Sequence, residues 1–315
     1  MSVPVGSQVE NPRPASPSPV PQRPAPRNDP AAWRQKFPGL ALPGLVWYAI
    51  FTVGPVVAMF VIAFLRWPGM LVDPGFAGFG NFRDVFADPV FWDALRNSAV
   101  QIAVGLPVMI VLAFLLAFYV VRKPRGHQVL RFMLFVPALI SAPATALMFY
   151  SLLNPDGLVN GVLETLGMSG RAWLADEATA LPSLIVIDLW AGIGYSAVLL
   201  ASRLDSVDEE VVQAAMIDGA GNGRLAWGIY WPIARDFIGV VAMLQFLSIL
   251  FSSAQNVLLL TKGGPGTSTT TLSYLIYQKA FVDADLGYSQ AVGIVLFVLG
   301  LAGMFAIRRL LRPTH

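Results

Sequence analysis

The sequence predicts an all-α polytopic membrane protein with six transmembrane helices. Of its 315 residues, 56% are apolar and 13% are charged, and the mean hydropathy is +0.63. Soluble domains carry roughly a quarter charged residues, so this chain has too few charges to cover a globular surface. Several apolar stretches also reach the ~20 residues that a bilayer-spanning helix needs. A soluble globular fold is therefore excluded.

The chain begins with a segment of different composition, residues 1–36. It is rich in proline, serine and arginine and has no apolar periodicity. Such a segment cannot bury enough apolar area to offset the entropy of ordering, so we expect a disordered tail. No apolar core of a signal peptide follows at the usual distance, which argues against a cleaved leader. We expect the remainder, 37–315, to form one domain.

Six apolar spans follow the tail, and an even number places both termini on the same side of the membrane. Outside the tail, ten basic residues fall on the side of the termini and six on the opposite side. The positive-inside rule therefore places both termini and the segment 204–236 in the cytoplasm. The predicted spans are residues 40–65, 95–121, 129–152, 181–203, 237–260 and 289–307.

The segment 204–236 is a long, charged connection between two spans. Ser206 with Glu209 fits a capping box, and Glu209 and Glu210 would occupy the first turn of a helix, where the dipole favours anions. Gly219 would end that helix, and a second short apolar segment would lead to Pro232. We expect a compact knob at the membrane surface, with an ordinary interfacial helix as the alternative. Val207, Val211, Ala214 and Ala215 would share one face of this helix, with Glu209, Glu210 and Gln213 on the other side.

The same segment resembles the EAA loop of ABC-importer permeases. Gln213-Ala214-Ala215, Gly219, Ile229 and Pro232 keep the spacing of that motif, although Gln213 stands where the family has glutamate and Trp231 where it has leucine. The resemblance implies that this loop couples the chain to a separate ATPase. The residues assigned to the coupling loop are Glu209, Glu210, Gln213, Ala214, Ala215, Asp218, Gly219, Ile229 and Pro232.

Two further blocks, 76–97 and 260–288, resemble the maltose-F and glycerol-3-phosphate-A-like permeases of carbohydrate uptake, and the similarity covers about residues 40–312. It implies a multi-pass protein of the bacterial cytoplasmic membrane. The implied partners are a second homologous permease, two ATP-binding subunits, an extracytoplasmic solute-binding protein, a sugar or polyol substrate and membrane lipid. No nucleic acid and no cofactor are expected.

Enzymatic activity is not expected of the chain itself. No Walker motif occurs, and the glycine-rich stretch 263–271 lacks the Gly-Lys-Ser/Thr ending that places a lysine on phosphates. The chain has no cysteine and two histidines, His127 and His315, one of them at the C-terminus. A metal site is therefore not expected.

Polar side chains repeat at helical spacing in two of the spans. Successive residues of a helix are rotated by ~100° about its axis. At that rotation, five polar side chains of the fifth span fall within an arc of roughly 100° and form one stripe. In the fourth, Asp188, Gly192 and Tyr195 share one face. Such stripes predict a substrate path, with Gly192 making room for ligand; the alternative is hydrogen-bonded contact between helices. The stripe of the fifth span consists of Gln245, Ser248, Ser252, Gln255 and Asn256.

The family resemblance adds detail to this path. It implies that Gly192, Tyr195 and Ser253 line the sugar site, whereas the matching positions on the third span are Ala138 and Ala142, which cannot hydrogen-bond through their side chains. The competing functional hypotheses are an ion-coupled secondary transporter that uses Asp188, and a membrane scaffold without transport activity.

Overall fold

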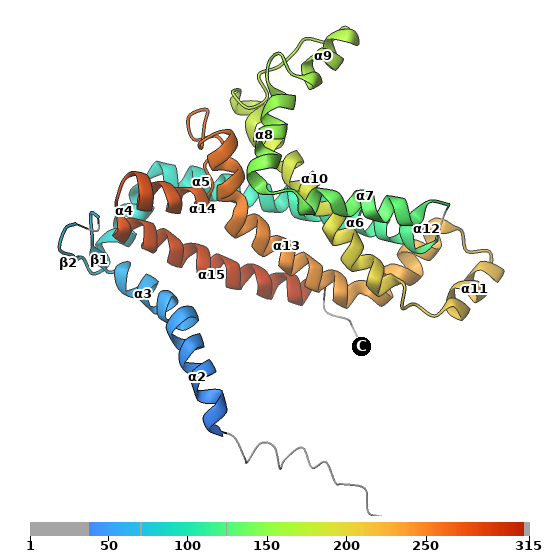
Figure 1. The fold of residues 1–315 in the computed structure, drawn as a ribbon, viewed down its shortest axis with the longest axis horizontal. Helices are drawn as coiled ribbons and strands as arrows, with labels where there is room; N and C mark the ends of the chain where they lie inside the picture. The colour runs from blue at the N-terminus through green and yellow to red at the C-terminus, as the bar shows by residue number, and fades with distance from the viewer. Residues whose placement is uncertain (1–37, 70, 124, 312–315) are drawn as a thin grey trace, which may run out of the picture. The chain divides into compact units, whose positions relative to one another are not determined.

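The computed structural model describes residues 38–69, 71–123 and 125–311 of the chain. The predicted disordered tail, 1–36, lies outside these residues. Helices make up most of the described chain (Figure 1). One short antiparallel pair of strands, β1 (Leu65–Arg66) and β2 (Gly75–Phe76), joins two of them, with Leu65 opposite Phe76.

The chain up to Gly54 is a compact unit separate from the one that begins at Pro55. In the first unit, α2 (Pro38–Tyr48) continues into a π-helical turn, η1 (Ala49–Val53). From Leu42 to Val53 the side chains of this helix are exposed, and the centroids of the Trp47 and Phe51 rings lie 4.2 Å apart. An apolar helix exposed all round is suited to a lipid environment.

From Gly54 onward the chain is almost continuously helical. The helices in chain order are α3 (Gly54–Ile62), α4 (Gly80–Ala87), α5 (Pro89–Val100), η2 (Gln101–Gly105), α6 (Leu106–Val121), α7 (His127–Leu139), α8 (Ala142–Leu153), α9 (Leu158–Thr165), α10 (Glu177–Leu204), α11 (Glu209–Ile217), α12 (Asn222–Leu225), η3 (Ala226–Tyr230), α13 (Trp231–Leu260), α14 (Leu272–Tyr277), η4 (Gln278–Val282) and α15 (Leu286–Leu310).

The prediction of a helical membrane protein with several spans is confirmed. Within the described residues, five helical stretches are long and apolar enough to cross a bilayer, and a bent pair of helices makes a sixth if it crosses as one span. The count of six spans stays a prediction. The five stretches are Leu42–Ile62, Pro89–Val121, Glu177–Leu204, Asn222–Leu260 and Leu286–Leu310.

The predicted third span, 129–152, is not one straight helix. It is broken into α7 and α8, which are bent by 99°. Ile140 and Ser141 are extended at the break, and Pro143 follows in the first turn of α8. Proline disfavours helix before it and lacks the N–H that a continuing helix needs. The apolar composition of this stretch concealed the break.

Two other spans begin earlier than predicted because an aspartate caps the helix. The Asp88 carboxylate accepts a hydrogen bond of 2.8 Å from the backbone N–H of Val90, and α5 starts at Pro89 rather than at residue 95. The Asp176 carboxylate accepts one of 2.8 Å from Ala178 N–H and starts α10. Such caps satisfy backbone donors that the first helical turn leaves free.

π-Helical turns precede three of the prolines inside long helices. The turns η1, η2 and η3 end directly before Gly54-Pro55, Leu106-Pro107 and Trp231-Pro232. A wider turn accommodates the missing proline N–H without ending the helix. Consequently the helix that contains the fifth predicted span starts at Asn222, and the second half of the predicted loop 204–236 is a helical extension of that span.

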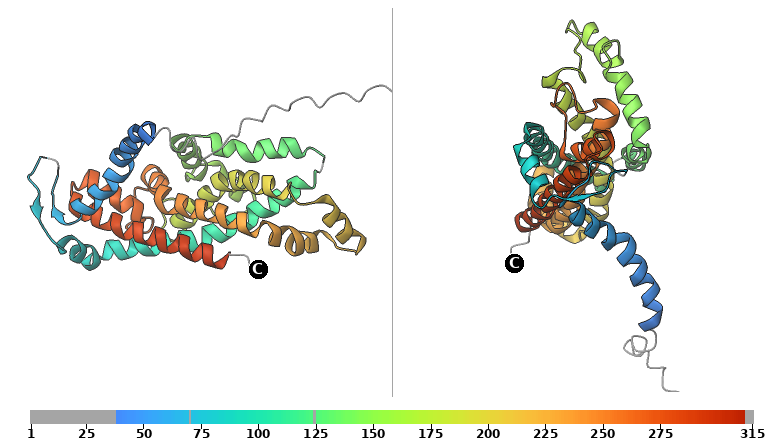
Figure 2. Two further views of the ribbon diagram at one scale, coloured as in Figure 1. Left: turned by 90° about the horizontal axis from the view of Figure 1, so that it is seen from below. Right: turned by 90° about the vertical axis from the view of Figure 1, so that its left-hand side faces the viewer.

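Within the second unit, α10 lies beside α6 and α7, while α13 lies beside α14 and α15 (Figure 2). The contact of α10 with α7 is so close that a Cβ on Gly194 would overlap the Leu134 carbonyl oxygen. The main buried cluster joins α6, α10 and α13 and includes Phe114, Leu200 and Ile238. These helices surround the cavity described next.

Candidate functional sites: a polar cavity and the loop 204–236

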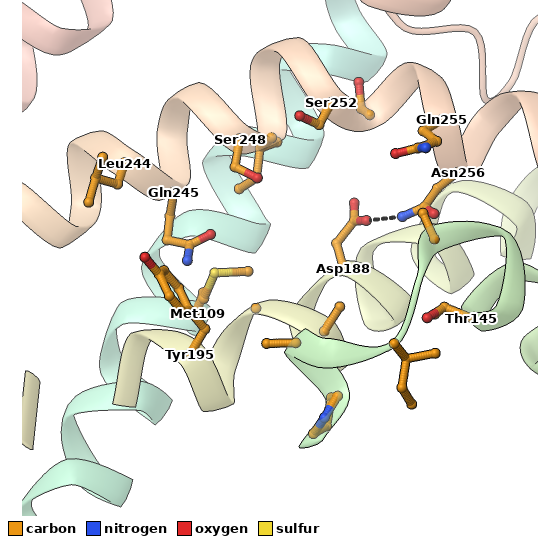
Figure 3. Close-up of a pocket in the computed structure, with 18 residues that line it drawn as sticks. Met109, Thr145, Asp188, Tyr195, Leu244, Gln245, Ser248, Ser252, Gln255 and Asn256 are labelled. Carbon is orange, nitrogen blue, oxygen red and sulfur yellow. Dashed lines mark hydrogen bonds between the residues drawn. The ribbon is translucent and has the colours of Figure 1, made fainter. Parts of the chain in front are cut away.

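A cavity of about 500 Å³ lies between α10 and α13, with α6, α7 and α8 completing its walls (Figure 3). All nine residues predicted for the substrate path line it, although they come from two helices separated by the loop 204–236. The structure thus brings the two predicted polar stripes together around one space. The nine residues are Asp188, Gly192, Tyr195, Gln245, Ser248, Ser252, Ser253, Gln255 and Asn256.

Asp188 is held by two amides from two other helices. Its Oδ1 accepts a hydrogen bond of 2.6 Å from Asn256 Nδ2, and its Oδ2 accepts one of 2.7 Å from Gln101 Nε2. Each oxygen of the carboxylate therefore has one amide donor. Gln101 is 2% exposed, and its buried Oε1 has no hydrogen-bond partner in the described chain. Asp188 therefore both faces the cavity and pairs with neighbouring helices, combining the two alternatives that the sequence left open.

The other polar side chains of the cavity differ in whether they already hydrogen-bond to other protein groups. Gln245 Nε2 donates to Ser196 Oγ at 2.7 Å, and the Ser253 hydroxyl bonds to Ser273 at 2.8 Å. By contrast, Ser248, Ser252 and Gln255 are exposed to the cavity and make no side-chain hydrogen bond with any described residue. These last three side chains offer hydroxyl and amide groups to a ligand.

The space directly beside Gly192 is occupied by Met109, and a role of this glycine in making room for ligand stays a prediction. A Cβ at this position would lie 2.7 Å from Cε of Met109 and 3.0 Å from its sulfur. The thioether of α6 therefore fills the space beside the glycine. Tyr195, one helical turn further along α10, is 40% exposed and borders the cavity with Met109 and Gln245 (Figure 3).

Three residues at the cavity are absent from the substrate path predicted from the sequence. Met109 lies in an apolar stretch of α6 and carries no polar signal. Gln101 donates a hydrogen bond to Asp188, and Thr145 lines the wall. Ala138 and Ala142 also line it, on either side of the break between α7 and α8. The wall is therefore apolar at these two positions.

The first half of the loop forms helix α11, which ends in a Schellman motif at Gly219. The Gly219 N–H bonds to Met216 O at 3.1 Å, and the Ala220 N–H bonds to Ala215 O at 2.9 Å. Gly219 has φ +78°, the left-handed conformation that glycine adopts without penalty. The predicted stop of the helix at this glycine is confirmed, with Asp218 exposed beside it.

Two details of the predicted helix are wrong. Asp208, not Ser206, occupies the N-cap position, and the Ser206 hydroxyl instead donates to Arg203 O at 2.7 Å. The buried residue of α11 is Val212, while Val211 and Ala214 are exposed. Val207 and Ala215, by contrast, are partly buried against the main apolar cluster.

The outer face of α11 carries the residues assigned to ATPase contact. Glu209, Glu210 and Gln213 are exposed, and Gln213 Nε2 donates to Glu209 Oε1 at 3.1 Å within the same helix. Ala215 is partly buried against the main apolar cluster. The helix thus exposes a small polar surface on one side and packs against the buried apolar cluster on the other.

The second half of the loop is anchored by aromatic rings. The Phe114 ring of α6 lies 5.4 Å from Trp227 and 4.9 Å from Trp231. Ile229 packs against the same buried cluster, and Pro232 is exposed where the π-helical turn ends. The loop is therefore continuous with the core formed by α6, α10 and α13 rather than a separate appendage.

Comparison with known proteins identifies the family. Residues 89–314 match the family described as binding-protein-dependent transport system inner membrane component. The chain belongs to this family. The match includes the cavity, the loop and five of the predicted spans, and the curated relatives are transport permeases, not enzymes.

Among the relatives, the diacetylchitobiose uptake permease NgcF of Streptomyces coelicolor is 32% identical, over 84% of this chain and 79% of its own. The lactose permease LacF of Rhizobium radiobacter is 30% identical, over 82% and 87%. A bacterial ABC transporter that imports alginate, also solved with its alginate-bound periplasmic protein, has a subunit of the same fold. Its TM-score is 0.76 at 22% identity, covering 87% of this chain and 93% of that one.

Proposed function

We propose that the chain is a permease subunit of an ATP-driven ABC importer for a sugar or related polyol, and that it forms half of the translocation path. The observation that carries this proposal is the cavity between α10 and α13. Ser248, Ser252 and Gln255 present neutral hydrogen-bonding groups to it without internal partners among the described residues. Sugar hydroxyls are matched by such groups, and Tyr195 adds an aromatic face.

The relatives support the substrate class. NgcF and LacF are named for the uptake of diacetylchitobiose and lactose, both saccharides. The alginate importer was solved with a saccharide-bound periplasmic protein, which supports a solute-binding protein as the partner that delivers substrate here. A second, homologous permease would supply the other half of the path.

We further propose that the loop 207–232 docks on one of two separate ATP-binding subunits, in the cytoplasm, with both termini on that same side. Its support is a rigid helix, α11, that ends at Gly219 and rests on the core through Val212. For ATP to drive transport, the loop must bind differently to the two states of the ATPase. Movement of the loop would then tilt α10 and α13, which line the cavity, in alternating access.

The experiment is uptake by the complete transporter in proteoliposomes, with a labelled saccharide that the solute-binding protein binds. We expect uptake to require internal ATP and to stop when the ATP-binding subunit is made inactive. Uptake that continues with an inactive ATPase, driven by a proton or sodium gradient, would refute the proposal and favour the ion-coupled alternative through Asp188. Family membership already argues against that alternative.

A further inference from the structure

We propose that Asp188 makes this half of the path selective for charge, so that the cavity admits uncharged saccharides and excludes those carrying a uronate, sulfate or phosphate group. This inference rests on the proposed function and names the substrate class of the same site. It starts from the composition of the wall. Of the eighteen residues that line the cavity in the described chain, Asp188 is the one acidic side chain, and none is Arg, Lys or His.

No cation among the described residues forms an ion pair with Asp188. The described residues contain two ion pairs, Arg66–Asp84 and Lys279–Asp283, and neither involves Asp188. The carboxylate oxygens instead accept hydrogen bonds from the Asn256 and Gln101 amides. Amide dipoles stabilise the carboxylate locally but leave its net charge facing the cavity.

The size of the effect follows from Coulomb's law. An anionic group ~6 Å from the carboxylate, at an effective dielectric constant of about 20, is disfavoured roughly a hundredfold. Mobile ions in a wet cavity reduce this, so a tenfold preference is a conservative expectation. A neutral saccharide has no such penalty and still finds the unbonded groups of Ser248, Ser252 and Gln255.

The chain offers a direct probe of this charge because it contains no cysteine. Ser252→Cys places a single thiol on the cavity wall, at an exposed position without side-chain hydrogen bonds to the described residues. The assembled transporter in detergent is treated with a cationic and an anionic methanethiosulfonate of similar size. The labelling rate of the parent transporter is first subtracted from that of the Ser252→Cys transporter. The difference is then divided by the rate at which the same reagent reacts with a small thiol in solution.

We expect the normalised rate of the cationic reagent to exceed that of the anionic reagent by about tenfold or more. Adding Asp188→Asn should bring this ratio close to one. Ser169→Cys, an exposed position after α9 that lies outside both the cavity and the loop 207–232, is the control, and its ratio should not respond to Asp188→Asn. A ratio of one or less for Ser252→Cys alone overturns the proposal, without depending on how well the Asp188 variant folds.

A transport assay then tests the substrate class. A neutral saccharide and its uronate analogue are chosen so that the solute-binding protein binds both, and ATP-driven uptake is compared. We expect the neutral compound to enter at least about tenfold faster, and Asp188→Asn to narrow the difference. Equal uptake of the two overturns the selectivity. Failure to transport any saccharide would instead refute the proposed function, while the thiol ratio would still report the charge of the cavity.

Discussion

The carboxylate of Asp188 and the amide of Asn256 meet at 2.6 Å, although 68 residues separate them in the chain. The bond ties α10 to α13 at the edge of the cavity, and the Gln101 amide ties the same carboxylate to η2 at the end of α5. Three helical segments thus converge on one charge. A change in the spacing of these segments during transport must stretch or exchange these bonds.

Asn256→Ala removes the hydrogen bond between α10 and α13 and should therefore weaken the packing of these two helices. The buried carboxylate loses one of its two donors, which costs about 1–3 kcal/mol. We expect a lower apparent unfolding temperature of the purified transporter and a reduced rate of uptake. Gln255→Ala is the matched control for stability, because Gln255 is exposed and bonds to no described residue. Equal unfolding temperatures for the two variants would contradict a role of the Asn256 bond.

Gly219→Val should impair contact with the ATPase. Valine at φ +78° is strained by roughly 1–2 kcal/mol, and relief of the strain would dismantle the end of α11. We expect loss of co-purification with the ATP-binding subunit, or uptake uncoupled from ATP hydrolysis. Gly221→Val is the control, since Gly221 has φ −75° and open space around a Cβ. Normal assembly and coupled uptake of the Gly219 variant would refute the docking role.

Gln213→Ala should change the free energy of ATPase binding by no more than about 0.5 kcal/mol. This is the size of the interaction between two exposed side chains four residues apart on one helix. Its hydrogen bond runs to Glu209 on the same helix, so the end of α11 stays in place without it. Titration of the ATP-binding subunit against the detergent-solubilised permeases measures the affinity. A loss comparable to that of Gly219→Val would show that the polar surface, rather than the turn, dominates docking.

Tyr195→Ala should slow uptake without disturbing assembly, because the ring borders the cavity and is 40% exposed. Tyr195→Phe separates the ring from the hydroxyl: retained uptake assigns the effect to the aromatic face. Tyr150→Ala is the control, since Tyr150 is also exposed but is not part of the wall. Unchanged uptake kinetics in Tyr195→Ala would remove this residue from the path.

The two glycines of α10 should respond differently to alanine. At Gly194 the new methyl group meets the backbone of Leu134, which cannot move aside without shifting α7. At Gly192 it meets the flexible end of Met109. We expect Gly194→Ala to destabilise by about 1–3 kcal/mol, and Gly192→Ala to be tolerated better, with recovery on adding Met109→Val. Thermal unfolding of these three variants and the parent protein measures the losses, and equal losses at both glycines would contradict the prediction.

The sequence alone was sufficient for features that depend on composition and helical repeat. Low charge and long apolar runs determined the membrane class, and a period of 3.6 residues placed Gln245, Ser248 and Ser252 on one face of α13. Gly219 marked the end of α11 because its backbone conformation is a local property. These features are fixed within a few residues of chain.

Only the tertiary structure decided what each polar group meets. The partners of Asp188 lie 87 and 68 residues away, and Met109 reaches Gly192 from another helix. Likewise, the break at Ile140–Ser141 turns α8 away from α7, which gives the cavity its wall. Contacts between distant helices depend on packing, which helical periodicity along one segment does not encode.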